Sequence, residues 1–158
     1  MLNEYEKELY HTYDANDLAK YIVNKCVVEN RPISNLQLQK ILYFIQYNYL
    51  RNFVRPAFYN KIEAWKYGPV VPDVYEKYTF MGGNVIINKY DINPLSIFEI
   101  EEENILVDDI TETCRAVDPW ALVRKVHKKG GPWQLVYEEG KRNEITIENI
   151  YRYIQETT

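Results

Sequence analysis

The 158-residue sequence is poor in the residues that build metal sites and nucleophilic active sites. Its two cysteines and two histidines share no ligand spacing such as C-x-x-C or H-x-x-x-H. Its six glycines form no phosphate-binding loop, since neither G-x-x-x-x-G-K-[ST] nor G-x-G-x-x-G occurs. We therefore predict no metal, no cofactor and no enzymatic activity.

Long apolar runs and an excess of basic residues are also missing. No window approaches the roughly 20 apolar residues of a membrane span, and charged side chains occupy positions 4 and 6–8, where a secretory signal needs an apolar segment. Nineteen Lys and Arg against 23 Asp and Glu give a net charge of −4, which does not attract nucleic acid or anionic lipid to the whole molecule. We expect a cytoplasmic protein with no membrane contact, and the charge balance disfavours nucleic-acid binding by this domain alone.

Tyrosine is the residue that the chain has in abundance, with 15 copies. A content of 46% hydrophobic and 27% charged residues is typical of a folded globular protein. The length fits one domain. We predict a single domain over residues 14–158, preceded by a flexible, tyrosine-rich arm at residues 1–13 that is a candidate surface for homo-oligomer formation.

Two helices near the start of the chain have the clearest pattern. Over residues 14–30, apolar side chains recur at helical spacing behind the candidate cap Asp14. Ser34 and Gln37 form a capping-box motif that opens a second helix with one apolar stripe. Three polar residues of this helix lie off the stripe, either solvated or in a polar contact: Gln39, Lys40 and Gln46.

Extended or turn-like segments follow. The helical pattern breaks over residues 55–67, and a short stretch of this segment that holds Ile62, Ala64 and Trp65 is a candidate for extended structure. Residues 68–72, G-P-V-V-P, are expected to form a stiff turn, because two prolines fix their own φ and Gly68 permits backbone angles that other residues resist. Residues 84–100 are expected to form either a small hairpin or an irregular excursion.

Proline and capping signals predict further, shorter helices. These run over residues 72–82, 119–130 and 132–140 and from residue 147 onward. The predicted fold class is therefore mainly α: a compact helical domain of about six helices with a minor β-hairpin or extended element.

The charges are unevenly distributed. Residues 99–118 hold eight acidic residues against one basic residue, and residues 119–142 hold six basic against two acidic residues. The acidic run at 101–103 is interpreted as a solvated turn or a helix start. The basic residues of 124–129 predict a ridge on one helix, which supports an alternative function as a DNA-binding transcriptional regulator. A charge match between the two segments, within the chain or with a partner, is the simpler interpretation.

Three blocks of the sequence resemble one protein family. Residues 36–46, L-Q-L-Q-K-I-L-Y-F-I-Q, are similar to its L-x-L-Q-K-L-L-Y-F-x-Q helix. Residues 62–75, I-E-A-W-K-Y-G-P-V-V-P-D-V-Y, resemble its E-A-W-x-x-G-P-V-V-P-x-V-Y block. Residues 127–133, H-K-K-G-G-P-W, are similar to its T-H-x-E-G-P-W element, with Val126 in place of the threonine. The family is the Panacea antitoxin-like domain, the phage-associated SocA/GepA-like group.

This resemblance implies a mainly helical, non-enzymatic antitoxin of a prokaryotic or prophage toxin–antitoxin system. The implied partner is a cognate protein toxin, encoded by an adjacent gene and neutralised by direct protein contact. For some members the resemblance also implies delivery of the bound toxin to a protease. It implies no catalytic residues.

The candidate partner-binding site comes from the second and third blocks. Trp65 and Trp133 each lie beside a Gly-Pro turn, so their rings either anchor the turns in the core or form a rigid, partly exposed patch that docks the toxin. No nucleophilic side chain can be assigned to His127 as a catalytic base. A hydrogen bond between helices is therefore favoured over a catalytic role for this residue. The candidate residues are Trp65, Tyr67, Gly68, Pro69, His127, Pro132 and Trp133.

Overall fold

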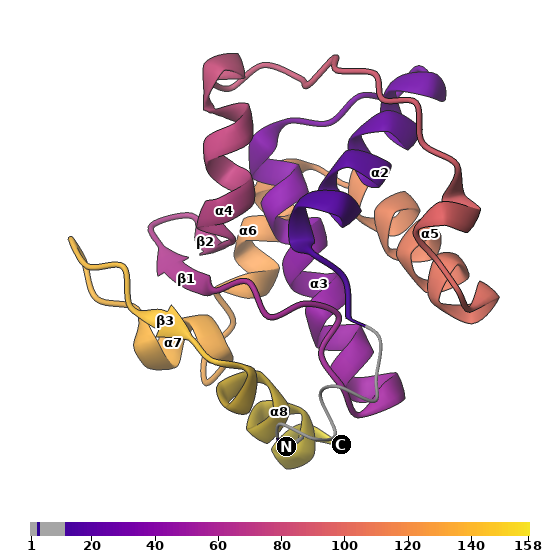
Figure 1. Cartoon of the computed structure of the whole chain (residues 1–158). Coiled ribbons are helices and arrows are strands. Elements are labelled where there is room, and N and C mark those ends of the chain that lie inside the picture. Colours follow the sequence, from indigo (N-terminus) through magenta and orange to yellow (C-terminus); the bar gives the residue numbers. More distant parts are fainter. Residues whose placement is uncertain (1–2, 4–11) are drawn as a thin grey trace.

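The computed structural model describes residue 3 and residues 12–158, which form a helical domain around one long helix, α3 (Asn35–Phe53). In Figure 1, α3 runs through the middle, with α2 (Ala15–Val28) and α5 (Glu101–Arg115) on one side and the small sheet on the other. Most of the arm predicted at residues 1–13 lies outside the described residues. Its last residue, Tyr13, is buried and forms an isolated parallel bridge with Phe58.

The first two helices begin at the predicted caps. Asp14 accepts a hydrogen bond from the main-chain nitrogen of Asn16 over 2.8 Å and opens α2. Ser34 and Gln37 form the predicted capping box and open α3. The helix after Thr146, α8 (Ile147–Thr157), also starts with a capping box. These predictions are confirmed because a cap depends on residues within one turn.

The mainly helical class is confirmed, and the described residues hold seven α-helices. The remaining helical elements are α4 (Pro72–Tyr75), the 3₁₀ turns η1 (Glu76–Met81) and η2 (Pro94–Ser96), α6 (Pro119–Val126) and α7 (Pro132–Val136). Both α6 and α7 end before the glycines that were expected to stop them. Helix α5 was not predicted from the sequence as a separate helix. Among the described helices, none has the length and hydrophobicity to cross a membrane.

A three-stranded antiparallel sheet replaces the predicted stiff turn. Strand β1 (Ile62–Trp65) lies between β2 (Gly68–Val70) and β3 (Glu144–Ile145). The prediction of a turn at 68–72 was wrong, because β1 and β2 pair with Trp65 opposite Gly68 and the turn is shorter. Pro69 fits a strand here because β2 is an edge strand, where a missing N–H breaks no ladder. Residues 84–100 form the irregular alternative, containing η2.

The three polar side chains off the apolar stripe of α3 make contacts inside the protein: Gln39, Lys40 and Gln46. The side chain of Gln46 donates to the carbonyl oxygen of Phe58 and accepts from the main-chain nitrogen of Ala57, both over 2.8 Å. Gln39 accepts from the nitrogen of Val71 over 2.8 Å. The central helix thus supplies the hydrogen bonds that two irregular segments need when they are buried.

A buried ion pair joins the beginning of α5 to the segment after α3. Glu103, 1% exposed, pairs with Arg55 and accepts a hydrogen bond from the hydroxyl of Tyr13 over 3.2 Å. The acidic run at 101–103 is a helix start, as one alternative predicted, but Glu103 is not solvated. This contact fixes the N-terminal end of α5 against the core.

Candidate functional site

Trp133, at the start of α7, joins two of the three sequence blocks. Its indole nitrogen Nε1 donates a hydrogen bond to the main-chain carbonyl oxygen of Trp65 over 2.7 Å. The imidazole of His127 stacks on its ring at 3.8 Å between centroids, and the ring of Tyr137 stacks at 4.4 Å. Trp133 is 9% exposed, so it anchors α7 to the hairpin of β1 and β2.

The Gly68–Pro69 segment is packed directly onto α3 and α6. The ammonium of Lys40 donates to the carbonyl oxygen of Pro69 over 2.9 Å. Gly68 has φ of +111°, and a Cβ there would lie 2.7 Å from Cγ2 of Val126 and 2.8 Å from Cε of Lys40. Only glycine meets both the backbone angle and the spacing. Gly68 and Pro69 are therefore buried supports of the hairpin, as Pro132 is of α7.

Two basic groups, buried Lys40 and partly buried His127, interact beneath this segment. Burial lowers the pKa of Lys40 to about 7, because desolvation penalises the ammonium and no carboxylate among the described residues pairs with it. Burial, and then the charge of Lys40, lower the pKa of His127. Within the described part of the chain, Nε2 of His127 has no hydrogen-bond partner, so the interhelix hydrogen bond expected there is absent. Both groups are held toward their neutral forms.

The exposed part of the candidate site is aromatic. Tyr67, in the turn between β1 and β2, is 46% exposed and meets Trp120 of α6, 49% exposed, edge to face with 5.2 Å between ring centroids. Trp65 is half-buried between the ring of Tyr75 and the guanidinium of Arg142, which lies 4.1 Å from its ring centroid. Sequence reasoning did not find Trp120, since the contact joins segments far apart in the chain.

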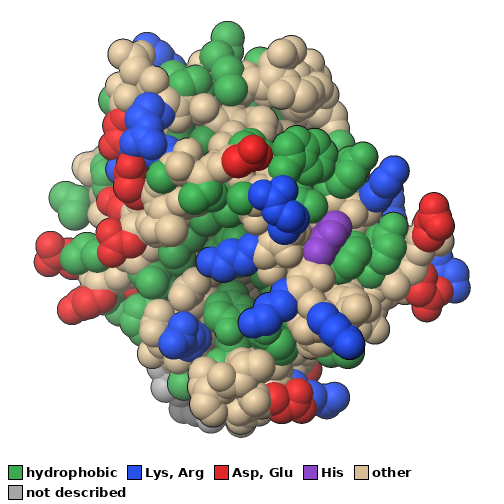
Figure 2. Space-filling view, turned by 180° about the vertical axis from the view of Figure 1, so that it is seen from behind, with side chains coloured by type: hydrophobic (Ala, Val, Ile, Leu, Met, Phe, Trp, Pro, Cys, Tyr) green, Lys and Arg blue, Asp and Glu red, His purple; other side chains and the backbone are tan. Residues whose placement is uncertain are grey.

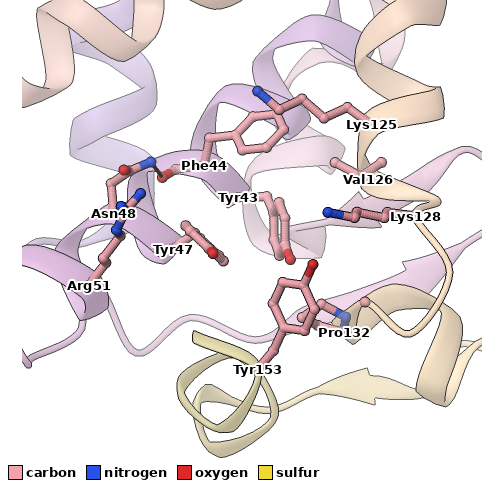
Figure 3. A pocket seen from close by; sticks show the side chains of 11 residues that line it. Tyr43, Phe44, Tyr47, Asn48, Arg51, Lys125, Val126, Lys128, Pro132 and Tyr153 are labelled. Atoms are coloured by element: carbon pink, nitrogen blue, oxygen red, sulfur yellow. Dashed lines mark hydrogen bonds between the residues drawn. The ribbon is translucent and has the colours of Figure 1, made fainter. Parts of the chain in front are cut away.

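A second feature is a cavity of about 300 Å³ between α3, α6, α8 and the start of α7, which we call the basic pocket (Figure 3). Its floor and walls are rich in tyrosine, and in Figure 3 the hydroxyls of Tyr43 and Tyr153 point toward one another. The lining residues are Tyr43, Phe44, Tyr47, Asn48, Arg51, Lys125, Val126, Lys128, Gly131, Pro132 and Tyr153.

The basic ridge predicted on one helix at 124–129 is divided by the end of that helix. Helix α6 stops at Val126, so Lys128 belongs to the following turn and reaches the basic pocket beside Lys125. Viewed from the side of α6, Lys, Arg and hydrophobic side chains gather in the centre and lower half of the face, whereas most Asp and Glu lie toward its margins (Figure 2). Lys125 and Lys128 therefore line a hollow, and the basic residues of 124–129 form no continuous helical ridge.

Groups suited to catalysis are not assembled around His127 in the described residues. Its ring contacts an indole, and Glu63 accepts a hydrogen bond from Nε1 of Trp65 over 3.0 Å. Cys114 is buried, and burial raises the pKa of its thiol to about 11. Over residues 12–158, no three His, Cys, Asp or Glu side chains are placed to hold a metal ion. What the site offers is rigid aromatic and basic surface.

Comparison with known proteins identifies the family. Residues 38–134 match the model of the Antitoxin SocA-like, Panacea domain, which is more than half of the chain. The protein belongs to the SocA-like Panacea family of antitoxins. Antitoxin SocA of Caulobacter vibrioides (strain NA1000 / CB15N) is 34% identical over 134 residues, covering 78% of this chain and 70% of that relative. No solved structure matches the chain.

Membership of the Panacea antitoxin family implies that this antitoxin has a partner toxin, without specifying which one. The matched range begins within α3 and ends within α7, so it contains the hairpin, the contact of Tyr67 with Trp120 and most of the basic pocket. Tyr153 of α8 completes the pocket from beyond that range.

Proposed function

We propose that this protein neutralises a protein toxin by binding it directly in a stoichiometric complex, without cofactor or catalysis. The observation that carries the proposal is membership of the SocA-like antitoxin family. The toxin is the product of an adjacent gene. The exposed aromatic surface described above is consistent with binding as the mode of action, because aromatic residues are enriched where proteins bind partners.

Tyr67 and Trp120 are the proposed centre of the contact. Their rings support each other, and the turn that carries Tyr67 is held from beneath by Lys40 and Gly68. An aromatic surface that is ordered before binding loses little conformational entropy when the complex forms. The buried members of the candidate site then act by positioning this surface.

The test is co-expression with the adjacent gene product, followed by purification of the complex and measurement of its stoichiometry. The double variant Tyr67→Ala/Trp120→Ala should stay folded, lose at least about tenfold in affinity and fail to neutralise. Phe80→Ala is the matched control, because Phe80 is 68% exposed and lies on η1. Full neutralisation by the double variant would remove this surface from the contact. Failure of any protein to co-purify would contradict neutralisation by binding.

Delivery of the bound toxin to a protease is a second step of the proposal, suggested by the family resemblance. It predicts that the toxin disappears faster from cells when this protein is present. The lifetime of the toxin after synthesis is stopped, with and without the antitoxin, measures this step. An unchanged lifetime would restrict the protein to stoichiometric inhibition.

A further inference from the structure

The basic pocket concentrates positive charge on a chain whose net charge is −4. Arg51, Lys125 and Lys128 line it with exposed side chains, and no acidic residue is among its lining. In the described part of the chain, none of the three cations lies within ion-pair distance of a carboxylate. The pocket thus presents basic charge that the described residues leave uncompensated.

An apolar groove continues from the basic pocket across α3, α5 and α6. This second hollow has a volume of about 310 Å³. It shares Phe44, Asn48 and Lys125 with the pocket, and the ammonium of Lys125 lies 5.3 Å from the ring centroid of Phe44 at the border between them. The other lining residues are Asp109, Ile110, Thr113, Cys114, Val117, Ala121 and Leu122.

We infer that the basic pocket and the apolar groove together receive one acidic segment of the toxin. Carboxylates of that segment lie among Arg51, Lys125 and Lys128, and an apolar side chain next to them occupies the groove beside Leu122. This inference rests on the proposed function, since it names the partner's chemistry at a second contact. The tyrosine hydroxyls of the pocket add neutral hydrogen-bond donors for the carboxylates.

Charge complementarity favours an acidic protein segment over nucleic acid as the occupant. Asp109 lines the groove. A phosphate backbone following the groove would meet this carboxylate, whereas nucleic-acid sites need a continuous basic track. A segment with carboxylates at one end and an apolar side chain at the other matches both hollows.

The first test compares two triple variants with the same change in net charge. Arg51→Glu/Lys125→Glu/Lys128→Glu reverses the pocket, and Lys61→Glu/Lys77→Glu/Lys89→Glu reverses three exposed lysines that do not line it. The probe is the protein that co-purifies with the wild-type chain. The pocket variant should lose at least about tenfold in association rate and most of the salt dependence, while the control variant changes about threefold or less.

Two further measurements locate the segment. A carbodiimide, which joins ammonium to carboxylate groups in contact, should link Lys125 or Lys128 to an acidic residue of the bound protein, as read by mass spectrometry. Thr113→Trp, which fills the groove from an exposed position, should weaken binding, whereas Thr79→Trp on η1 should not.

The outcomes separate this inference from the proposed function. If both triple variants bind the co-purified protein stably and with wild-type association rates, the inference is overturned and the proposed neutralisation is unaffected. Cross-links from Lys61 with none from Lys125 or Lys128 also overturn it. If no protein co-purifies but a short DNA duplex binds the wild-type chain and not the pocket variant, the proposed function and the inference both fail in favour of nucleic-acid binding.

Discussion

The indole N–H of Trp133 donates a hydrogen bond to the main-chain carbonyl oxygen of Trp65 over 2.7 Å. The two residues lie in different sequence blocks and in different elements, α7 and β1. Because the acceptor is a main-chain atom at the end of β1, this contact fixes the hairpin at the point where its turn begins. The exposed ring of Tyr67 lies two residues further along the chain, so its position depends on Trp133.

Trp133→Phe should therefore destabilise the protein. The substitution keeps an aromatic ring for stacking but removes the N–H, which leaves the carbonyl of Trp65 unpaired at a cost of about 1–3 kcal/mol. Urea unfolding measures the loss. Trp120→Phe is the control, since Trp120 is half exposed and should change stability by less than about 0.5 kcal/mol. Equal losses in the two variants would contradict the role given to the hydrogen bond.

Lys40 should make stability depend on pH. Its pKa is about 7 in the folded protein against 10.5 for the free group, so between these values the unfolded chain binds more protons and stability rises with pH. Lys40→Met should reduce the slope between pH 7 and 9.5 by up to about 1.4 kcal/mol per pH unit. Urea unfolding across this range, below the titration of free tyrosine, tests it. The exposed control Lys61→Met should retain the wild-type slope; a wild-type slope in Lys40→Met would refute the prediction.

Gly68→Ala should be strongly destabilising. The new Cβ would lie under 3 Å from Val126 and Lys40 at a φ of +111°, so strain and overpacking combine to at least about 2 kcal/mol. Thermal unfolding with Gly83→Ala as the matched change provides the comparison, because a Cβ at Gly83 meets nothing within 4 Å. Similar melting temperatures for the two variants would show that the hairpin shifts without cost.

Glu103→Gln should break the buried ion pair with Arg55. Removing one charge of a buried pair leaves the other poorly compensated, with an expected loss of about 3–5 kcal/mol in the free energy of unfolding. Glu102→Gln, one residue earlier on α5 and exposed, should have little effect. Chemical denaturation of both variants at neutral pH measures the free energy of unfolding. A loss below about 1 kcal/mol for Glu103→Gln would contradict a stabilising role for the ion pair.

Local signals explain which elements could be predicted from the sequence. The caps at Asp14, Ser34 and Thr146 act within one turn, so the beginnings of α2, α3 and α8 were predictable. Helix α5 lacks such a signal. Its buried face is partly polar and narrow, consisting of Glu103, Val107, Thr111 and Cys114. Leu106 and Ile110 pack beside this face, but without a cap the acidic first turn dominated the interpretation of that segment.

The candidate site depended on contacts that no short pattern encodes. The sequence indicated the hairpin and α7 blocks but not which of their side chains would be exposed, because Lys40 and Trp133 fix them from distant elements. The meeting of Tyr67 with Trp120 needs the tertiary fold. The basic pocket does too, since it combines residues of α3, α6 and α8.

Different residues of helix α3 stabilise the interior of the fold and line its surface pocket. Gln39 and Gln46 hold neighbouring main chain inside the protein, whereas Asn48 and Arg51 of the same helix face the basic pocket. Descendants of one ancestral gene can therefore diverge at the pocket positions while inheriting an unchanged scaffold. The same division marks a small set of positions for a library that retargets this protein by directed evolution.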